Sequence, residues 1–187
     1  MDALIAFLKS DANAANAFGA LASAAAAVLA LFVSCVSVWI SVSSARSQRR
    51  HNELSVRPLA EVTVADYEDS LRVKLRNNGS GPMIVLAVTV SDGANAHESL
   101  IDWMPALPQG RPWNTFTHAL RRRTLQAGAE IVLLELTAHE NEANFSVCRD
   151  RVRAALAPLT VNVEYKDIYE TVMRPCQKPL SWFGRNL

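Results

Sequence analysis

Charge is missing from a long N-terminal stretch of this chain: residues 12–45 contain no Asp, Glu, Lys, Arg or His. The apolar part, residues 17–42, exceeds the roughly 20 residues that a helix needs to cross a ~30 Å hydrocarbon core. A cleaved signal peptide would have a positive start and a shorter apolar core, whereas this start carries Asp2, Lys9 and Asp11. The stretch therefore predicts one transmembrane helix.

Cysteine is also scarce, and its spacing excludes a secreted scaffold stapled by disulfides. Of three cysteines, Cys35 falls in the apolar stretch, and only Cys148 and Cys176 remain in the polar part. No framework of closely spaced cysteines exists, although one bridge between these two stays open.

The sequence lacks the patterns that signal a metal or cofactor site. It has no C-x-x-C motif, and its histidines show no i, i+4 pair; they are His51, His97, His118 and His139. The Gly79–Gly81 segment lacks the residues of a phosphate loop or a nucleophile elbow, so it is interpreted as a turn. Cys148 lies on an apolar helix stripe and is expected to be a packed thiol. We expect no enzyme activity, cofactor or metal.

A cluster of arginines follows the apolar stretch and sets its expected orientation. Arg46, Arg49, Arg50 and Arg57 come after the stretch, whereas only Lys9 precedes it. By the positive-inside rule, the C-terminal side lies in the cytoplasm and the N-terminus lies outside. We call residues 46–50 the arginine collar. Its arginines and Trp39 are the predicted membrane-interface residues.

These features divide the chain into three parts. Residues 1–16 are predicted to form a short interfacial segment, because their apolar side chains cluster before the span. Residues 17–54 form the transmembrane helix with its basic collar, and residues 55–187 form a cytoplasmic domain. The near-neutral net charge of +1 gives no reason to expect nucleic acid as a partner.

A stripe of small residues runs along the predicted span with a period of 3.5 residues, the spacing of a left-handed helix pair. We call this stripe the seam; it contains Ser23, Ala27, Ala30, Ser34, Ser37 and Ser41. One interpretation is packing against a second copy or another membrane protein. The other is that an Ala/Ser-rich helix shows such a stripe by chance, its hydroxyls bonding to their own backbone.

After Pro58 the hydropathy period changes to two, which indicates half-buried antiparallel strands. Leu71, Val73 and Leu75 alternate with basic residues, and a turn follows at residues 77–82. The next strand places Ile84, Leu86, Val88 and Val90 on one face. Residues 145–156 show helical spacing, with a stop at Pro158. The expected fold is an immunoglobulin-like antiparallel β-sandwich with one embedded helix; a small β-barrel is the alternative.

The rest of the domain is less regular. One or two helical turns are expected near residues 97–104, and strands over about residues 113–124. Another strand is expected after a turn at Gly128, and a closing hairpin with its tip at Lys166 and Asp167. The tail from Pro175 is expected to be irregular. Trp103, Trp113 and Trp182 are interpreted as core residues or as an exposed binding patch.

Two arginine groups are the candidate ligand site. They are Arg121, Arg122 and Arg123 in one run, and Arg149 and Arg153 on one face of the predicted helix. If folding brings them together, they provide donors for a phosphate-bearing ligand or an anionic lipid. The alternative interpretation is a solvated surface paired with neighbouring carboxylates.

The segments HNELSVRP after the span, LRNNGSGP at a strand end, LQAGAEIVLLEL and VEYKDIYE together resemble a loose group of uncharacterised bacterial single-span proteins. The resemblance covers most of the chain and its motifs are structural. It implies a bacterial inner-membrane location and a cytoplasmic β-sandwich, and it implies no activity.

Two functional hypotheses follow. The first is a non-enzymatic, membrane-anchored interaction module that associates through its span and β-domain, as a homo-oligomer or with another membrane protein. The second is a ligand-gated membrane effector that senses a small anionic signal through the arginine groups.

Overall fold

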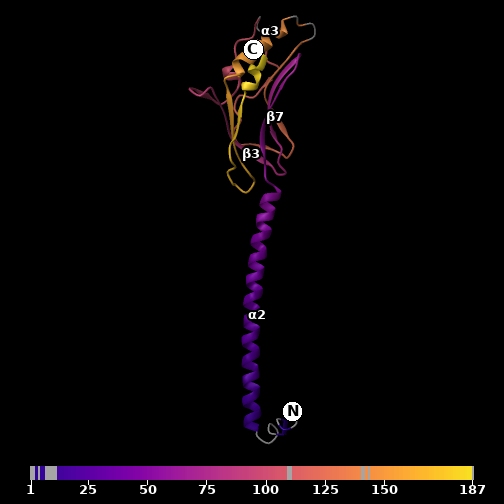
Figure 1. The fold of residues 1–187 in the computed structure, drawn as a ribbon, viewed down its shortest axis with the longest axis vertical. Coiled ribbons are helices and arrows are strands. Elements are labelled where there is room, and N and C mark those ends of the chain that lie inside the picture. The colour runs from indigo at the N-terminus through magenta and orange to yellow at the C-terminus, as the bar shows by residue number, and fades with distance from the viewer. Residues whose placement is uncertain are drawn as a thin grey trace. The chain divides into compact units, whose positions relative to one another are not determined.

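The computed structural model describes residues 3, 5–6, 12–108, 111–139, 142 and 144–186. The chain forms two compact units, Met1–Asn52 and Glu53–Leu187, which are described separately below (Figure 1). The interfacial segment predicted over residues 1–16 lies largely outside the described residues.

The first unit is dominated by α2, a helix of 44 residues over Ala12–Ser55. At 1.5 Å per residue it is about 66 Å long, well beyond a ~30 Å hydrocarbon core. Its large apolar side chains, such as Leu29, Phe32 and Trp39, are exposed along its length. It is long and apolar enough to cross a membrane, as the sequence predicted.

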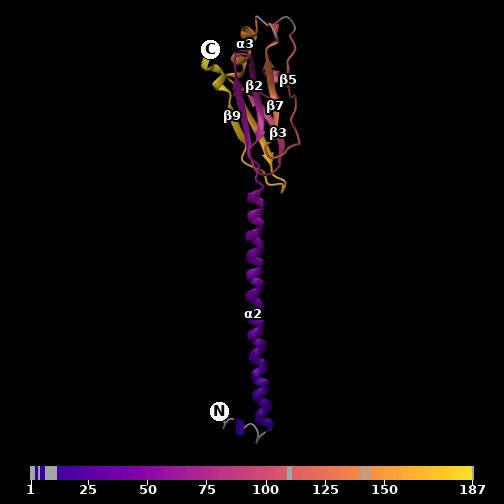
Figure 2. The same cartoon turned by 90° about the vertical axis from the view of Figure 1, so that its right-hand side faces the viewer.

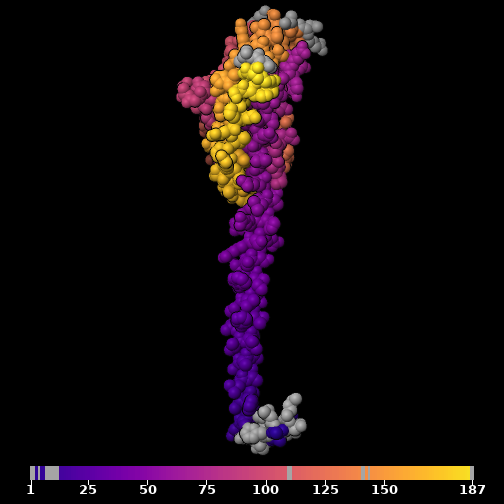
Figure 3. Space-filling model, in the orientation of Figure 1, coloured from indigo at the N-terminus to yellow at the C-terminus, as the bar shows by residue number. Residues whose placement is uncertain are grey.

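The second unit is a sandwich of two antiparallel sheets, which confirms the predicted fold class (Figures 1 and 2). The first sheet has the order β1-β2-β7-β5; its strands are β1 Ala60–Asp66, β2 Ser70–Asn77, β7 Glu130–Thr137 and β5 Thr115–Phe116. The second has the order β4-β3-β8-β9, with β6 also paired to β3; its strands are β4 Ala96–His97, β3 Met83–Ser91, β8 Thr160–Lys166, β9 Cys176–Pro179 and β6 Arg123–Leu125. Strands β1 and β9 lie side by side on one surface of the sandwich (Figure 3).

The described residues of the domain also form the 3-10 turn η1 (Ile101–Trp103), the α-helix α3 (Phe145–Leu156) and the 3-10 helix η3 (Ser181–Asn186). The helical spacing predicted for α3 is confirmed, since its buried apolar residues are Phe145, Cys148, Val152 and Leu156. The predicted helical turn near residues 97–104 is η1. Trp103 and Trp113 pack against the core, whereas Trp182 remains 40% exposed.

The alternation predicted for β1 and β2 is confirmed, because Val62, Leu71, Val73 and Leu75 are buried. The alternation predicted for β3 is correct only in its second half. Met83 and Val85 are buried in place of the predicted Ile84 and Leu86, and the inward face passes to Val88 and Val90 beyond them. The cause is a register shift between Val85 and Ala87, where an extra residue switches the side-chain alternation to the other face.

Two predictions in the second half of the domain differ from the structure in extent. The strands expected over residues 113–124 are reduced to the short β5 and β6, separated by irregular chain. The closing hairpin is longer than predicted, because β9 begins only at Cys176, within the tail expected to be irregular. Leu180 and Phe183, in the same tail, are fully buried in the core.

The chain enters the sandwich at one end, which we call the linker end after the linker Val56–Pro58. By strand register, this end contains the start of β1, the turn from β2 to β3, β6 and the loop after β8. The opposite end, which we call the distal end, contains α3, η3 and the hairpin between β1 and β2 (Figures 1 and 2).

The linker packs closely against the turn between β2 and β3. A β-carbon on Gly81 would lie 1.8 Å from the carbonyl oxygen of Val56, and one on Gly79 would lie 2.4 Å from that of Arg57. Both positions therefore require glycine because the neighbouring backbone leaves no space for a β-carbon, and not because φ is positive. The Ser80 hydroxyl donates a hydrogen bond to the carbonyl of Ser55 at 2.6 Å, which fixes the start of the linker.

Candidate functional site

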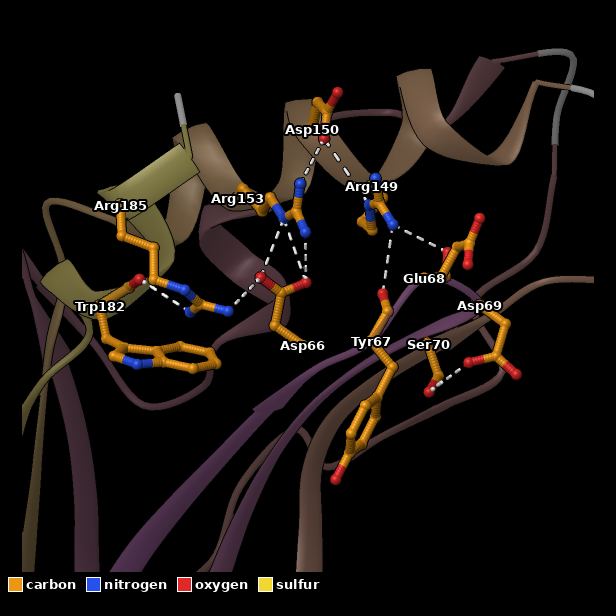
Figure 4. A network of polar contacts seen from close by, with 10 residues as sticks. All are labelled: Asp66, Tyr67, Glu68, Asp69, Ser70, Arg149, Asp150, Arg153, Trp182 and Arg185. Carbon is orange, nitrogen blue, oxygen red and sulfur yellow. Dashed lines mark hydrogen bonds and ion pairs between the residues drawn. The ribbon is translucent and has the colours of Figure 1, made fainter.

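A buried ion-pair network joins three elements at the distal end of the sandwich (Figure 4). Asp66, the last residue of β1, has no exposed side-chain surface. The Arg153 guanidinium on α3 donates from Nη2 to Asp66 Oδ1 at 2.7 Å and from Nε to both carboxylate oxygens at 3.1 Å. Arg185 of η3 lies 3.3 Å from the other oxygen. One carboxylate therefore holds both helices to the sheet.

The local sequence explains how these groups meet. Asp66 continues the inward alternation of β1, so its carboxylate points to the core side of the strand. Arg149 and Arg153 lie four residues apart and share one face of α3. Arg149 donates from Nη1 to the carbonyls of Tyr67 and Glu68, at 3.2 and 2.8 Å, and closes the hairpin after β1.

The electrostatics of this network stabilise the charged state of Arg153. Burial alone would lower the pKa of this guanidinium, but the hydrogen bonds and charges of Asp66 and Asp150 outweigh it and raise the pKa. Arg185 in turn lies over the ring of Trp182, with its guanidinium carbon 3.2 Å from the centroid. Arg153 and the Nη1 group of Arg149, which the sequence offered to a ligand, thus hold α3 to the first sheet, and Arg185 holds η3 there.

The second arginine group lies elsewhere. Arg121 pairs with Glu98, and Arg123 is paired in register with Val85, near the linker end. The distal end of β3 is Ser91, opposite Thr160 and just after α3. Six residues of strand separate Val85 from Ser91, or about 20 Å. The structure therefore separates Arg123 from the arginines of α3, and Arg121 pairs with Glu98 rather than joining them.

A hollow of about 270 Å³ lies on the outer face of the first sheet, over β1, β2 and β7. Its lining residues include Thr63, Tyr67, Arg72, Lys74, Arg76 and Glu130. Arg72 pairs with Glu135 and Lys74 with Glu130, each at 2.6 Å. The hydrogen bond from Lys74 holds the pKa of Glu130 below its ordinary value. This face is a mixed-charge surface beside an exposed tyrosine.

The seam and the interface residues are exposed on α2, including Trp39 and Arg46. Ser34, Ser37 and Ser41 each donate a hydroxyl hydrogen bond, at 2.8 Å, to the carbonyl four residues earlier; Ser23 does the same at 2.9 Å. These hydroxyls are therefore satisfied within the helix. What the seam offers a second helix is small side-chain volume, which lets backbones approach.

Within the described part of the chain, no group of three or more His, Cys, Asp or Glu side chains is placed to hold a metal ion. The cysteines are unbonded: Cys148 is buried in α3, Cys176 is half-buried in β9, and Cys35 is exposed on α2. Cys148 and Cys176 therefore do not form the disulfide that the sequence allowed. His97 packs edge-on against Trp103, and His118 against Phe116.

Sequence reasoning missed the polar residues that organise the domain. The Asp66 side chain is fully buried, and Asn77 and Asp167 are at least 97% buried. Each continues the inward alternation of its strand or follows it directly, after Val64, Leu75 and Tyr165 respectively. A polar residue in phase with a buried apolar face was the signal available for all of them.

An apolar helix long enough to cross a membrane, joined to an antiparallel β-sandwich, defines the class of candidate single-span protein with one β-domain. The chain belongs to the family described as "Domain of unknown function (DUF8453)", whose model matches residues 18–181. That match covers the apolar part of α2 and nearly all of the sandwich. No curated protein and no solved structure matches the chain.

Proposed function

We propose that this protein is a non-enzymatic interaction module anchored in the bacterial inner membrane. Helix α2 spans the bilayer with its N-terminus outside, and the β-sandwich lies in the cytoplasm, where it holds a partner protein near the membrane. The observation that carries the proposal is α2 itself: a long helix with exposed apolar side chains, followed directly by the arginine collar.

The β-domain supplies the proposed partner surface. The outer face of the first sheet combines paired charges with exposed Tyr67 around the hollow described above. Tyrosine and arginine are enriched at protein interfaces, because they combine apolar contact area with polar ends. The seam adds a second mode of association, between spans, through close approach of small residues.

The ligand-gated alternative relied on convergence of the two arginine groups. Arg153 is engaged with Asp66, and Arg123 lies toward the other end of the sandwich. No observation favours that alternative over the interaction module.

Cross-linking in native membranes, followed by identification of the attached proteins, tests the proposal. We expect a stoichiometric partner that is lost when Tyr67 and Arg76 are replaced by Ala and Gln, and retained in the Val147→Ser variant, a change on α3 at the distal end. Recovery of the chain without any cross-linked protein, or its recovery in the soluble fraction, would contradict it.

A further inference from the structure

The loop between β8 and β9 presents apolar side chains to solvent. Ile168, Tyr169 and Val172 are 46%, 47% and 68% exposed. Single exposed apolar side chains are ordinary on a protein surface. Here they lie within five residues of one another on a single loop, and Leu59, 57% exposed, lies at the same end of the sandwich. This grouping indicates a contact surface.

The loop is held in one conformation by a buried carboxylate. Asp167 is 3% exposed and accepts hydrogen bonds from the backbone N–H groups of Tyr169 and Thr171, both at 2.8 Å. Lys166 pairs with Glu170 across the loop, and the N–H of Met173 donates to the carbonyl of Tyr165 at 3.0 Å. The apolar side chains therefore project from a preformed loop, so binding through them orders little additional chain.

The loop is at the linker end of the sandwich. Its preceding residue, Lys166, pairs with Ile84, directly after the turn that packs on the linker. Figures 1 and 2 both show this loop at the end of the domain opposite α3. The apolar loop and the tether to the span thus belong to the same end.

Positive charge surrounds the loop. Exposed arginines at the linker end, by register and sequence position, are Arg57, Arg122, Arg123 and Arg174. Of the neighbouring carboxylates, Glu130 pairs with Lys74 and Glu170 with Lys166, whereas Glu61 accepts from the neutral Asn78 and Glu164 is exposed on β8, so the arginines outnumber the unpaired carboxylates. In the part of the chain that the structure describes, no ion pair uses Arg57, Arg122, Arg123 or Arg174. An apolar tip with a basic rim complements an anionic lipid surface.

The tether keeps this end close to the bilayer. From Ala45, the last residue of the uncharged stretch, to the helix end at Ser55 is about 15 Å of helix. The three-residue linker adds at most about 11 Å. Roughly 5–8 Å of this combined length of helix and linker lies within the headgroup layer. The length of chain between the uncharged stretch and the sandwich therefore keeps the linker end within about 20 Å of the headgroups.

We propose that the loop at residues 167–173, together with the arginines around it, is a second membrane contact that docks the linker end of the sandwich on anionic lipid headgroups. This inference rests on the proposed membrane anchoring. A protein partner is the competing occupant, but the basic rim and the short tether favour lipid. Docking would fix how the first sheet is presented to a partner.

Brominated lipids test the contact in the full chain. The Val172→Trp variant is reconstituted in vesicles of phosphatidylcholine and phosphatidylglycerol, with and without bromine on the acyl chains. The matched control is Val147→Trp, the same change at a residue 50% exposed on α3 at the distal end. We expect a blue shift and a loss of the added emission only for Val172→Trp. Both effects should weaken in pure phosphatidylcholine and when Ile168→Asp is added.

Flotation of the vesicles separates the two proposals. Protein that fails to float with the vesicles overturns the membrane anchoring itself. Protein that floats, but in which Val172→Trp is quenched no more than Val147→Trp, overturns the docking alone. Quenching that is equal in anionic and neutral vesicles overturns the role of the arginines. Burial of the loop seen only in native membranes assigns the surface to a protein partner and overturns the lipid assignment.

Discussion

The side-chain oxygen of Asn77 accepts a hydrogen bond from the backbone N–H of Leu59 at 3.2 Å, so the end of β2 holds the start of β1 and the linker before it. The same oxygen accepts from the N–H of Gly79 at 3.0 Å. Its amide nitrogen donates to the carbonyls of Gly81 and Leu125, at 2.8 and 3.1 Å. A single buried side chain therefore joins the linker, the turn and β6.

Replacing Asn77 by Asp keeps the shape and removes the donors. The carbonyls of Gly81 and Leu125 then face a carboxylate, so the free energy of unfolding should fall by about 3 kcal/mol. Urea denaturation of the full chain in detergent measures the change. Asn114→Asp is the control: this residue is exposed and uses its side-chain oxygen to accept from the N–H of Thr137, which a carboxylate also does, so stability should shift by less than about 0.5 kcal/mol.

Gly81→Ala should be strongly destabilising, because the added methyl group would overlap the backbone of Val56. Both sides of the contact are main chain, so relief requires the linker or the turn to move, at a cost of about 3 kcal/mol. Thermal unfolding is the measurement. Gly184→Ala, whose β-carbon would meet Ala157 at an ordinary 3.4 Å, should leave the midpoint nearly unchanged. Equal effects from both variants would contradict the close packing of the linker.

Arg153→Ala should cost about 3–5 kcal/mol, because it leaves the Asp66 carboxylate buried with Arg185 as its remaining cation. Susceptibility of α3 and η3 to limited proteolysis should rise at the same time. Arg151→Ala removes an exposed arginine from the same helix and serves as the control. A wild-type unfolding curve for Arg153→Ala would show that the ion pair does not hold these helices.

Stability should fall in acid through Glu130. The hydrogen bond from Lys74 lowers the pKa of this carboxyl below its ordinary value of 4.5 in the folded state. Its contribution is therefore fully present above about pH 4.5 and is lost as the pH falls through the lowered folded pKa. The stability difference between wild type and Glu130→Gln should shrink over that range. Lys74→Met should weaken the same pH dependence, leaving the smaller effect of the Arg76 and Arg72 charges; an unchanged dependence would assign it to other carboxylates.

Ser34→Leu and Ser37→Leu place bulk on the seam and should reduce association between spans. Because the serine hydroxyls already bond within α2, any effect comes from lost close approach rather than lost hydrogen bonds. Oligomer size in detergent and cross-linking in membranes are the measurements. Ser43→Leu makes the same change off the seam. Unchanged oligomers in all three variants would leave the stripe without a role in packing.

Local periodicity predicted the elements that depend on neighbouring residues. In β1, β2 and α3, apolar residues recur with the period of the element and pack on one face against the core. Long-range contacts decided the rest. The bulge at Val85 depends on pairing with β8, and β9 forms because β8 offers it an edge. The arginine groups could be found in the sequence, but their separation depends on strand register.

Helix α2 runs without a break from the apolar span through the arginine collar to Ser55. An α-helix advances by about 100° and 1.5 Å per residue. The direction in which the seam faces relative to the arginine collar is therefore fixed by the continuous helix. Inserting one alanine between them would swing the two apart by more than a quarter turn, whereas four would nearly restore the alignment. The number of residues between the seam and the collar thus determines their relative rotation about the helix axis as well as their separation.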